Sequence, residues 1–108
     1  MFKFNIGSAV NGVDQTIDAG TVLATLRQHG FVQPELIKTE RSDTETTYVV
    51  VASDRIDYNM QGHRAAVYAV CEELQQDAIA YKVYNTGYLV GPKAEEWGGA
   101  FLQEYFIE

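Results

Sequence analysis

The segment from residue 59 to 74, NMQGHRAAVYAVCEEL, contains side chains that could do chemistry. His63 could act as a general base, and Cys71 could act as a nucleophile if a base took its proton. They lie eight residues apart, which on a helix is a rise of about 12 Å. Because a thiolate–imidazole pair needs hydrogen-bond contact, these two cannot activate each other, whereas His29 from another helix could reach Cys71. The segment therefore holds no catalytic pair of its own.

The spacing of its apolar residues is typical of an amphipathic helix. They recur at i, i+3, i+4 and i+7, as Val67, Val70, Cys71 and Leu74. A thiol within such a stripe behaves as a small hydrophobe, so we predict that Cys71 is a buried structural residue. His63 and Arg64 fall in the first turn, where we expect them to lie at the surface.

An acidic surface with tyrosines is predicted near the end of the chain. Tyr84 and Tyr88 flank a predicted hairpin turn, where side chains are often exposed, and an acidic pair with a tryptophan follows. Exposed tyrosine beside acidic residues is a suitable composition for binding another protein. The predicted partner-binding residues are Tyr84, Tyr88, Glu95, Glu96 and Trp97. The alternative is that Trp97 packs in the core and the glutamates are only solvated.

Motifs for metal, nucleotide or phosphate binding are absent from the sequence. It contains no CxxC, HExxH, GxGxxG or GxxxxGK[ST] pattern. Asp54 and Asp57 could meet in a loop and hold a cation, but Arg55 lies between them, and solvated acids are the better interpretation. We therefore predict no catalytic residue, no metal and no cofactor.

The charge of the chain limits its partners. Fifteen acidic residues against eight basic ones give a formal net charge of −7, with a pI near 4.7. Phosphate backbones and anionic membranes repel such a chain, so nucleic acid and membrane are not expected as partners. A protein partner with a basic surface would complement this charge.

Length and composition predict one soluble domain spanning residues 1–108. Apolar residues make up 46% of the chain and aromatic residues 12%, as in globular proteins. No apolar run is long enough to cross a bilayer, and no secretory signal is recognisable at the start. With Cys71 as the single cysteine, no disulfide can form within the chain. These features predict a cytoplasmic protein.

The periodicity of apolar residues along the sequence predicts two helices and five strands. Asp18 can cap a helix that ends at Gln28 before Gly30, and the second helix spans about 60–77. Asn11-Gly12 is a strong hairpin signal, and Asn85-Thr86-Gly87 suits a three-residue hairpin loop. The predicted strands are 2–6, 35–41, 45–53, 78–84 and 88–91. For residues 100–108, helix and strand remain open, with a slight preference for strand.

This order predicts an α+β fold. An antiparallel sheet would carry two helices on one face, in a ferredoxin-like (split β-α-β) arrangement with an extra C-terminal hairpin or strand. Residues 48–52 are apolar on both faces of their strand, although both helices would cover the same face. Either residues 101–107 or a second subunit must cover the other face, and we expect a homodimer.

Three functions fit these features. The first is a small acidic, non-catalytic protein-binding domain, an adaptor or inhibitor of the kind that phages or mobile elements encode, which masks a basic site on its partner. The second is a small-molecule-binding or enzymatic domain with a pocket formed by His29, Tyr58, His63 and Arg64. The third is a homodimeric domain without a ligand. We expect the first.

Overall fold

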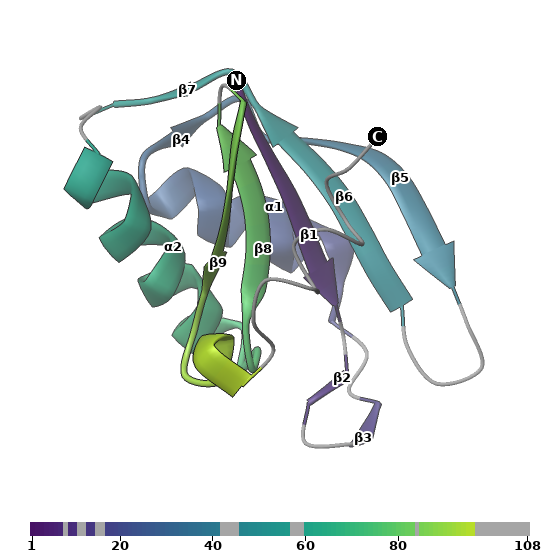
Figure 1. Ribbon diagram of the computed structural model, residues 1–108. Helices are drawn as coiled ribbons and strands as arrows, with labels where there is room; N and C mark the ends of the chain where they lie inside the picture. Colours follow the sequence, from purple (N-terminus) through teal and green to yellow (C-terminus); the bar gives the residue numbers. More distant parts are fainter. Residues whose placement is uncertain are drawn as a thin grey trace.

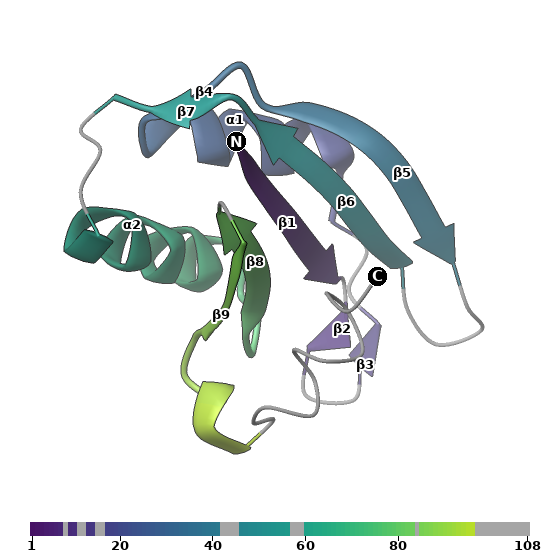
Figure 2. The ribbon, with the colours of Figure 1, turned by 45° about the horizontal axis from the view of Figure 1, so that its top comes forward.

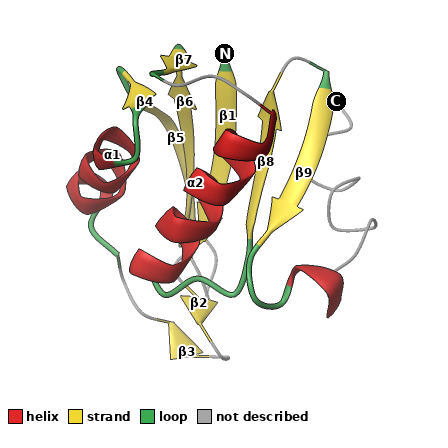
Figure 3. Ribbon diagram, turned by 90° about the vertical axis from the view of Figure 1, so that its left-hand side faces the viewer, coloured by secondary structure: helices red, strands yellow, loops and turns green. Residues whose placement is uncertain are grey.

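A five-stranded antiparallel sheet forms the centre of the molecule, and both helices lie on one of its faces (Figures 1 and 3). The computed structural model describes residues 1–7, 9–10, 13–14, 17–41, 46–56, 60–83 and 85–96. The helices are α1 (Ala19–Gln28) and α2 (Met60–Glu73). The strands of the sheet are β1 (Phe2–Gly7), β5 (Glu35–Arg41), β6 (Thr46–Ala52), β8 (Ile79–Val83) and β9 (Thr86–Val90). The predicted α+β class with an antiparallel sheet is confirmed.

The order of strands across the sheet is β5-β6-β1-β8-β9. Helix α1 connects β1 to β5, and β6 lies between those two strands; helix α2 connects β6 to β8, and β1 lies between them. Each helix thus crosses over a strand that pairs with both strands it connects, as in a split β-α-β unit. Strand β9 extends the sheet beyond β8 and forms one of its two edges.

Two short pairs of strands lie outside this sheet (Figure 2). Strand β2 (Ala9–Val10) pairs with β3 (Val13–Asp14), as expected for a hairpin at residues 11–12, although those two turn residues lie outside the described part. Strand β4 (Phe31–Val32) pairs with β7 (Asp54–Arg55). The sequence does not predict this second pair, because strands of two residues are too short to show any periodicity.

Helix α1 begins and ends where its capping residues predict. The side chain of Asp18 accepts a hydrogen bond from the backbone nitrogen of Thr21 at 3.3 Å, which satisfies one free donor of the first turn. Gly30 follows the helix with φ at 90°, a conformation that glycine adopts without steric cost. Val22 and Leu26 are buried against the sheet, as their spacing predicts.

The main core lies between the helices and the sheet. Phe2, Phe4 and Ile6 alternate along β1 and are all buried, whereas the residues between them are partly exposed. The ring of Phe4 lies with its centre 5.0 Å from that of Phe31 and 5.9 Å from that of Tyr81. These contacts join the central strand to β4 and β8.

The other face of the sheet is buried in places as well. Val49 on β6 is 6% exposed and Ala80 on β8 is 1% exposed, although both point away from the helices. This burial occurs within a single chain, so a second subunit is not required to explain it. Residues 101–107, the alternative cover, lie outside the described residues. The homodimer stays a prediction.

The hairpin between β8 and β9 is shorter than predicted. Val83 pairs with Thr86 and Lys82 with Gly87, so both Thr86 and Gly87 belong to β9 and not to a three-residue loop. β-branched residues such as threonine favour strands, which explains why β9 begins earlier than Tyr88. The prediction of glycine in a left-handed loop position was wrong.

Candidate functional site

Cys71 is a buried structural residue, as predicted. Its side chain is 0% exposed, and its Sγ donates a hydrogen bond to the backbone oxygen of Gln76 at 3.1 Å. Burial raises the pKa of the thiol to about 12, and the negative charges of Asp77 and Glu72 act in the same direction. Cys71 is therefore a neutral thiol at physiological pH and cannot act as a nucleophile.

His63 differs from its prediction because it is fully buried instead of lying at the surface. It lies four residues before Val67, so it continues the apolar stripe of α2 toward the sheet, and that spacing was a signal that sequence analysis missed. Its Nδ1 atom is hydrogen bonded to the hydroxyl of Tyr81 at 2.7 Å. The His63 ring also lies edge-on to Phe2 and Tyr88, with ring centres 5.7 and 5.4 Å away.

Both members of this buried pair are held neutral. Desolvation lowers the pKa of His63 most strongly, and the positive charges of Arg55 and Arg64 lower it further. Desolvation likewise raises the pKa of Tyr81. We conclude that His63 and Tyr81 form a neutral polar contact within the aromatic part of the core.

This burial predicts that stability falls with acid. Unfolded His63 takes up a proton below about pH 6.5, whereas folded His63 resists protonation because its pKa is lowered. The free energy of unfolding should therefore decrease as the pH falls from about 6.5 toward the lowered pKa of the folded state.

Urea unfolding of the wild type and of His63→Gln across this pH range measures the effect. The variant should show a weaker pH dependence than the wild type, because it lacks the buried imidazole. Equal slopes in His63→Gln and the wild type would contradict the assignment.

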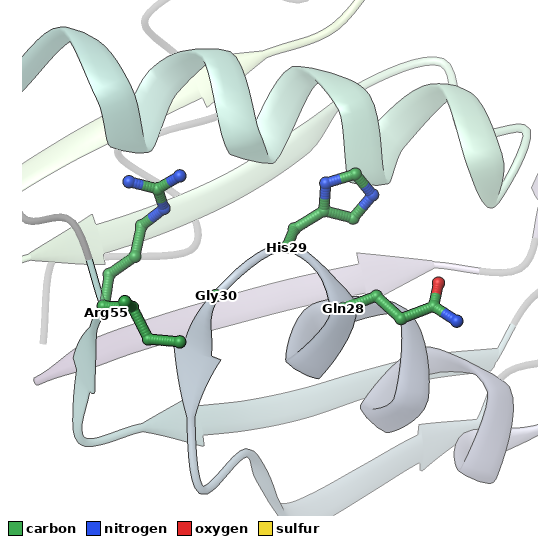
Figure 4. Close-up of a pocket in the computed structure, with 5 residues that line it drawn as sticks. Gln28, His29, Gly30 and Arg55 are labelled. Carbon is green, nitrogen blue, oxygen red and sulfur yellow. The ribbon is translucent and has the colours of Figure 1, made fainter.

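His29 lies elsewhere, in a contact between the two helices. It caps the end of α1, and its Nε2 atom lies 2.9 Å from Oε1 of Glu73 on α2. It also borders an open pocket of about 310 Å³ that is lined by Gln28, His29, Gly30, Arg55 and Ile56. Figure 4 shows His29 and Arg55 extending toward α2 from two different segments, while Gln28 points away from them.

The pocket predicted from His29, Tyr58, His63 and Arg64 is therefore not assembled as expected. His63 does not line the pocket beside His29, because it is packed between α2 and the sheet. Tyr58 lies outside the described residues. The suggested approach of His29 to Cys71 is not found either, since His29 contacts Glu73 and the thiol contacts Gln76.

Arg64 instead lines a different pocket, which lies between α2 and the edge strand β9. This pocket also measures about 310 Å³, and its lining consists of Arg64, Tyr68, Leu89, Val90, Gly91, Ala94 and Glu95. It brings Arg64, from the predicted small-molecule site, together with Glu95, from the predicted partner-binding surface. We call it the α2–β9 pocket.

Helix spacing and a tight turn position its two sides. Arg64 and Tyr68 are four residues apart and thus neighbours on one face of α2. On the other side, the chain turns after β9, where the backbone nitrogen of Lys93 donates to the oxygen of Asp77 at 2.9 Å and that of Ala94 donates to Gly91 at 3.2 Å. This turn brings Glu95 to the pocket.

Tyr88 packs between Tyr81 in the core and Arg64 in the α2–β9 pocket. It is only partly exposed, in contrast to the exposed side chain expected at a hairpin, and its ring stacks on Tyr81 with centres 5.1 Å apart. The guanidinium carbon of Arg64 lies 6.0 Å from the centre of the Tyr88 ring, a distance that suits a cation–π contact. Tyr88 thus connects Arg64 to the buried contact between His63 and Tyr81.

The α2–β9 pocket contains charged, aromatic and apolar side chains. Arg64 provides a permanent positive charge and Glu95 a carboxylate, and both side chains are exposed to solvent. Tyr68 is 39% exposed and offers an aromatic face, while Leu89 and Val90 add apolar surface. Its volume is at the lower end of the range for small-molecule sites, roughly 300–1,000 Å³.

The remaining predicted partner-binding residues are only partly described. Glu96 is exposed next to Glu95, whereas Tyr84 and Trp97 lie outside the described residues. Within the described part of the chain, no three His, Cys, Asp or Glu side chains come close enough together to hold a metal ion. In the same part, neither helix has the length and apolar run needed to span a membrane.

Comparison with known proteins yields one structural likeness. No protein family and no curated protein matches the sequence. Among solved structures, a phage SAM lyase in complex with S-methyl-5'-thioadenosine has a similar fold, with a TM-score of 0.54. The alignment covers 82% of this chain and 86% of the lyase chain at 10% sequence identity. At this identity the likeness shows that the two chains share the fold.

Proposed function

We propose that this domain binds a small molecule that carries both a positive and a negative group, and that the site is the α2–β9 pocket. The observation that carries the proposal is the placement of Arg64 and Glu95 on the two sides of one pocket that Tyr68, Leu89 and Val90 also line. Arg64 suits a carboxylate or phosphate group of the ligand, and Glu95 suits an ammonium or sulfonium group.

The structural neighbour suggests which ligands to test first. That protein is a SAM lyase bound to S-methyl-5'-thioadenosine. Because a shared fold does not imply a shared ligand, this ligand is only an analogy for the present chain. The analogy agrees with the pocket, because an adenine ring could stack on Tyr68 while the charged amino-acid end of SAM meets Arg64 and Glu95. Nucleosides of this type are therefore the ligand class that we propose.

Isothermal titration with SAM and with S-methyl-5'-thioadenosine tests this function. We expect Arg64→Gln and Glu95→Gln each to weaken SAM binding about tenfold or more, which corresponds to about 1.4 kcal/mol. S-methyl-5'-thioadenosine lacks the charged amino-acid end and should be affected less. Glu96→Gln is the matched control, since Glu96 is exposed but does not line the pocket. If neither ligand binds, or if all three variants bind like the wild type, the proposal fails.

A second candidate function is the binding of a basic partner protein by the acidic surface. It is favoured by the exposure of Glu95 and Glu96 after β9 and of Glu72 at the end of α2. Such binding should weaken with salt, because screening acts over about 8 Å at physiological ionic strength. The test is to capture a partner from host lysate and to measure its binding. Binding that changes neither with salt nor in the double variant Glu95→Lys with Glu96→Lys would refute this function.

Four expectations about the whole domain also remain proposals. The split β-α-β order supports the ferredoxin-like type, and the phage origin of the structural neighbour agrees with an origin in a phage or mobile element. Light scattering tests the homodimer, and a monomer at micromolar concentration would refute it. Location in the cytoplasm is the fourth expectation.

A further inference from the structure

The pocket that His29 borders joins the end of α1 to β7 (Figure 4). Backbone contacts hold its two sides together. Phe31 pairs with Arg55 in the short sheet of β4 and β7, and the backbone nitrogen of Ile56 donates to the oxygen of Gly30 at 2.8 Å. These contacts place the side chains of His29 and Arg55 at one cavity of about 310 Å³. We call it the α1–β7 pocket.

Arg55 brings a positive charge to this pocket. Its guanidinium carbon lies 5.9 Å from the centre of the Phe31 ring, a cation–π distance that limits the positions open to the side chain. The neighbouring acid Asp54 directs its carboxylate to the backbone nitrogen of Arg55, at 2.8 Å. A guanidinium has five N–H donors in one plane, so it can bind a carboxylate through two parallel hydrogen bonds and still keep other contacts. This side of the pocket therefore suits a carboxylate group.

His29 brings a ring nitrogen to the other side. Its Nε2 atom lies 2.9 Å from Oε1 of Glu73, and because an ionised carboxylate can only accept, Nε2 donates this hydrogen bond. Its Nδ1 atom forms no hydrogen bond with any described residue. In Figure 4, Nδ1 lies on the side of the ring that faces Arg55. Nδ1 accepts a hydrogen bond when the ring is neutral and donates one when it is charged, so a hydroxyl group, which does both, suits either state.

The rest of the pocket leaves room for a short carbon chain. Ile56 is 74% exposed and offers apolar surface next to the two polar groups. A Cβ atom at Gly30 would lie 3.8 Å from Cγ of Arg55 and 3.8 Å from Cβ of Ile56. Glycine therefore leaves open a part of the pocket that a side chain at this position would occupy.

We propose that the α1–β7 pocket binds a small hydroxycarboxylic acid. Arg55 binds the carboxylate, Nδ1 of His29 binds the hydroxyl, and the carbon chain contacts Ile56. The hydrogen bond from Nε2 to Glu73 fixes the orientation of the ring that this requires. SAM is not a ligand of this pocket, because its ammonium and sulfonium groups give it a net positive charge that Arg55 repels.

This proposal does not depend on the function proposed for the α2–β9 pocket. The two pockets share no lining residue. In NMR titrations, a hydroxy acid should shift the backbone amides of residues 28–31 and 54–56, whereas SAM should shift those of residues 64–68 and 89–95. Failure of one ligand to bind therefore leaves the test of the other intact.

Titration with 2-hydroxybutyrate and 3-hydroxybutyrate, at constant pH and ionic strength, tests the site. Butyrate is the matched ligand, since it lacks only the hydroxyl. We expect the wild type to bind at least one hydroxy acid with a dissociation constant on the order of 1 mM, about fivefold or more tighter than butyrate. Arg55→Gln should weaken the binding of every acid about tenfold. His29→Phe should remove the preference for the hydroxy acid over butyrate.

Arg27→Gln is the matched control. Arg27 is an exposed arginine in the last turn of α1 and does not line the pocket, so this change removes the same charge outside the site. Circular dichroism confirms that each variant is folded before the titration. Absence of binding by the wild type, equal wild-type affinity for butyrate and both hydroxy acids, or unchanged binding by Arg55→Gln would overturn the proposal. A preference for the hydroxy acid that persists in His29→Phe would overturn it as well.

Discussion

Replacing Gly91 with alanine is expected to destabilise the protein by about 3 kcal/mol or more, or to prevent folding altogether. Gly91 has φ at 149°, where side chains are strained. A Cβ atom there would lie 2.6 Å from the Cα of Ala78 and 2.6 Å from the backbone oxygen of Asp77. Because both atoms belong to the backbone, no rotation of a side chain can relieve the clash.

Urea unfolding of Gly91→Ala and Gly7→Ala measures this effect with a matched control. Gly7 also lies in a strand end, but a Cβ atom there would meet its nearest neighbour, Oε1 of Gln76, at 3.8 Å, an ordinary contact. Gly7→Ala should therefore change stability little. Similar unfolding midpoints for the two variants would show that the backbone at Gly91 does not lie as close to Asp77 as described.

Replacing Cys71 with aspartate is expected to prevent folding. The side chain is fully buried in the hydrophobic core, and a Cβ atom at Gly91 would lie only 2.9 Å from its sulfur, so the surroundings are tightly packed. A carboxylate without a charged partner costs several kcal/mol there, and the nearby acids Asp77 and Glu72 increase the cost. Cys71→Ala should instead fold, with a loss of about 1–2 kcal/mol.

The wild-type thiol offers a second measurement. A neutral, buried sulfhydryl should react with a thiol reagent only when the protein opens, so labelling in native buffer should be orders of magnitude slower than in denaturant. Comparable rates in the two conditions, or a folded and stable Cys71→Asp protein, would contradict the burial of this residue.

The regular elements could be predicted because each repeats a simple pattern. Alternation of Phe2, Phe4 and Ile6 marks one buried face of β1, and the stripe from Val67 to Leu74 marks the buried face of α2. The acidic cap at Asp18 likewise marks the start of α1. In each case the local pattern and the tertiary packing favour the same structure.

The site could be predicted only in part, because it depends on contacts between distant segments. Arg64 and Glu95 belong to two different predicted sites, because nothing in the local sequence indicates that the turn after β9 returns to α2. His63 was placed at the surface because histidine in a first turn usually is solvated. Its spacing from Val67 agrees with burial, but its polar partner Tyr81 lies 18 residues away and is indicated by no periodicity.

A two-dimensional NMR titration of the isotope-labelled protein with SAM tests the central claim most directly. If SAM binds between α2 and β9, the largest shift changes will occur at the backbone amides of residues 64–68 and 89–95, which include the pocket lining. The amides around His29 and Arg55 should change little, because they belong to the other pocket. Unchanged spectra, or changes confined to the pocket beside His29, would contradict the α2–β9 pocket as the functional site.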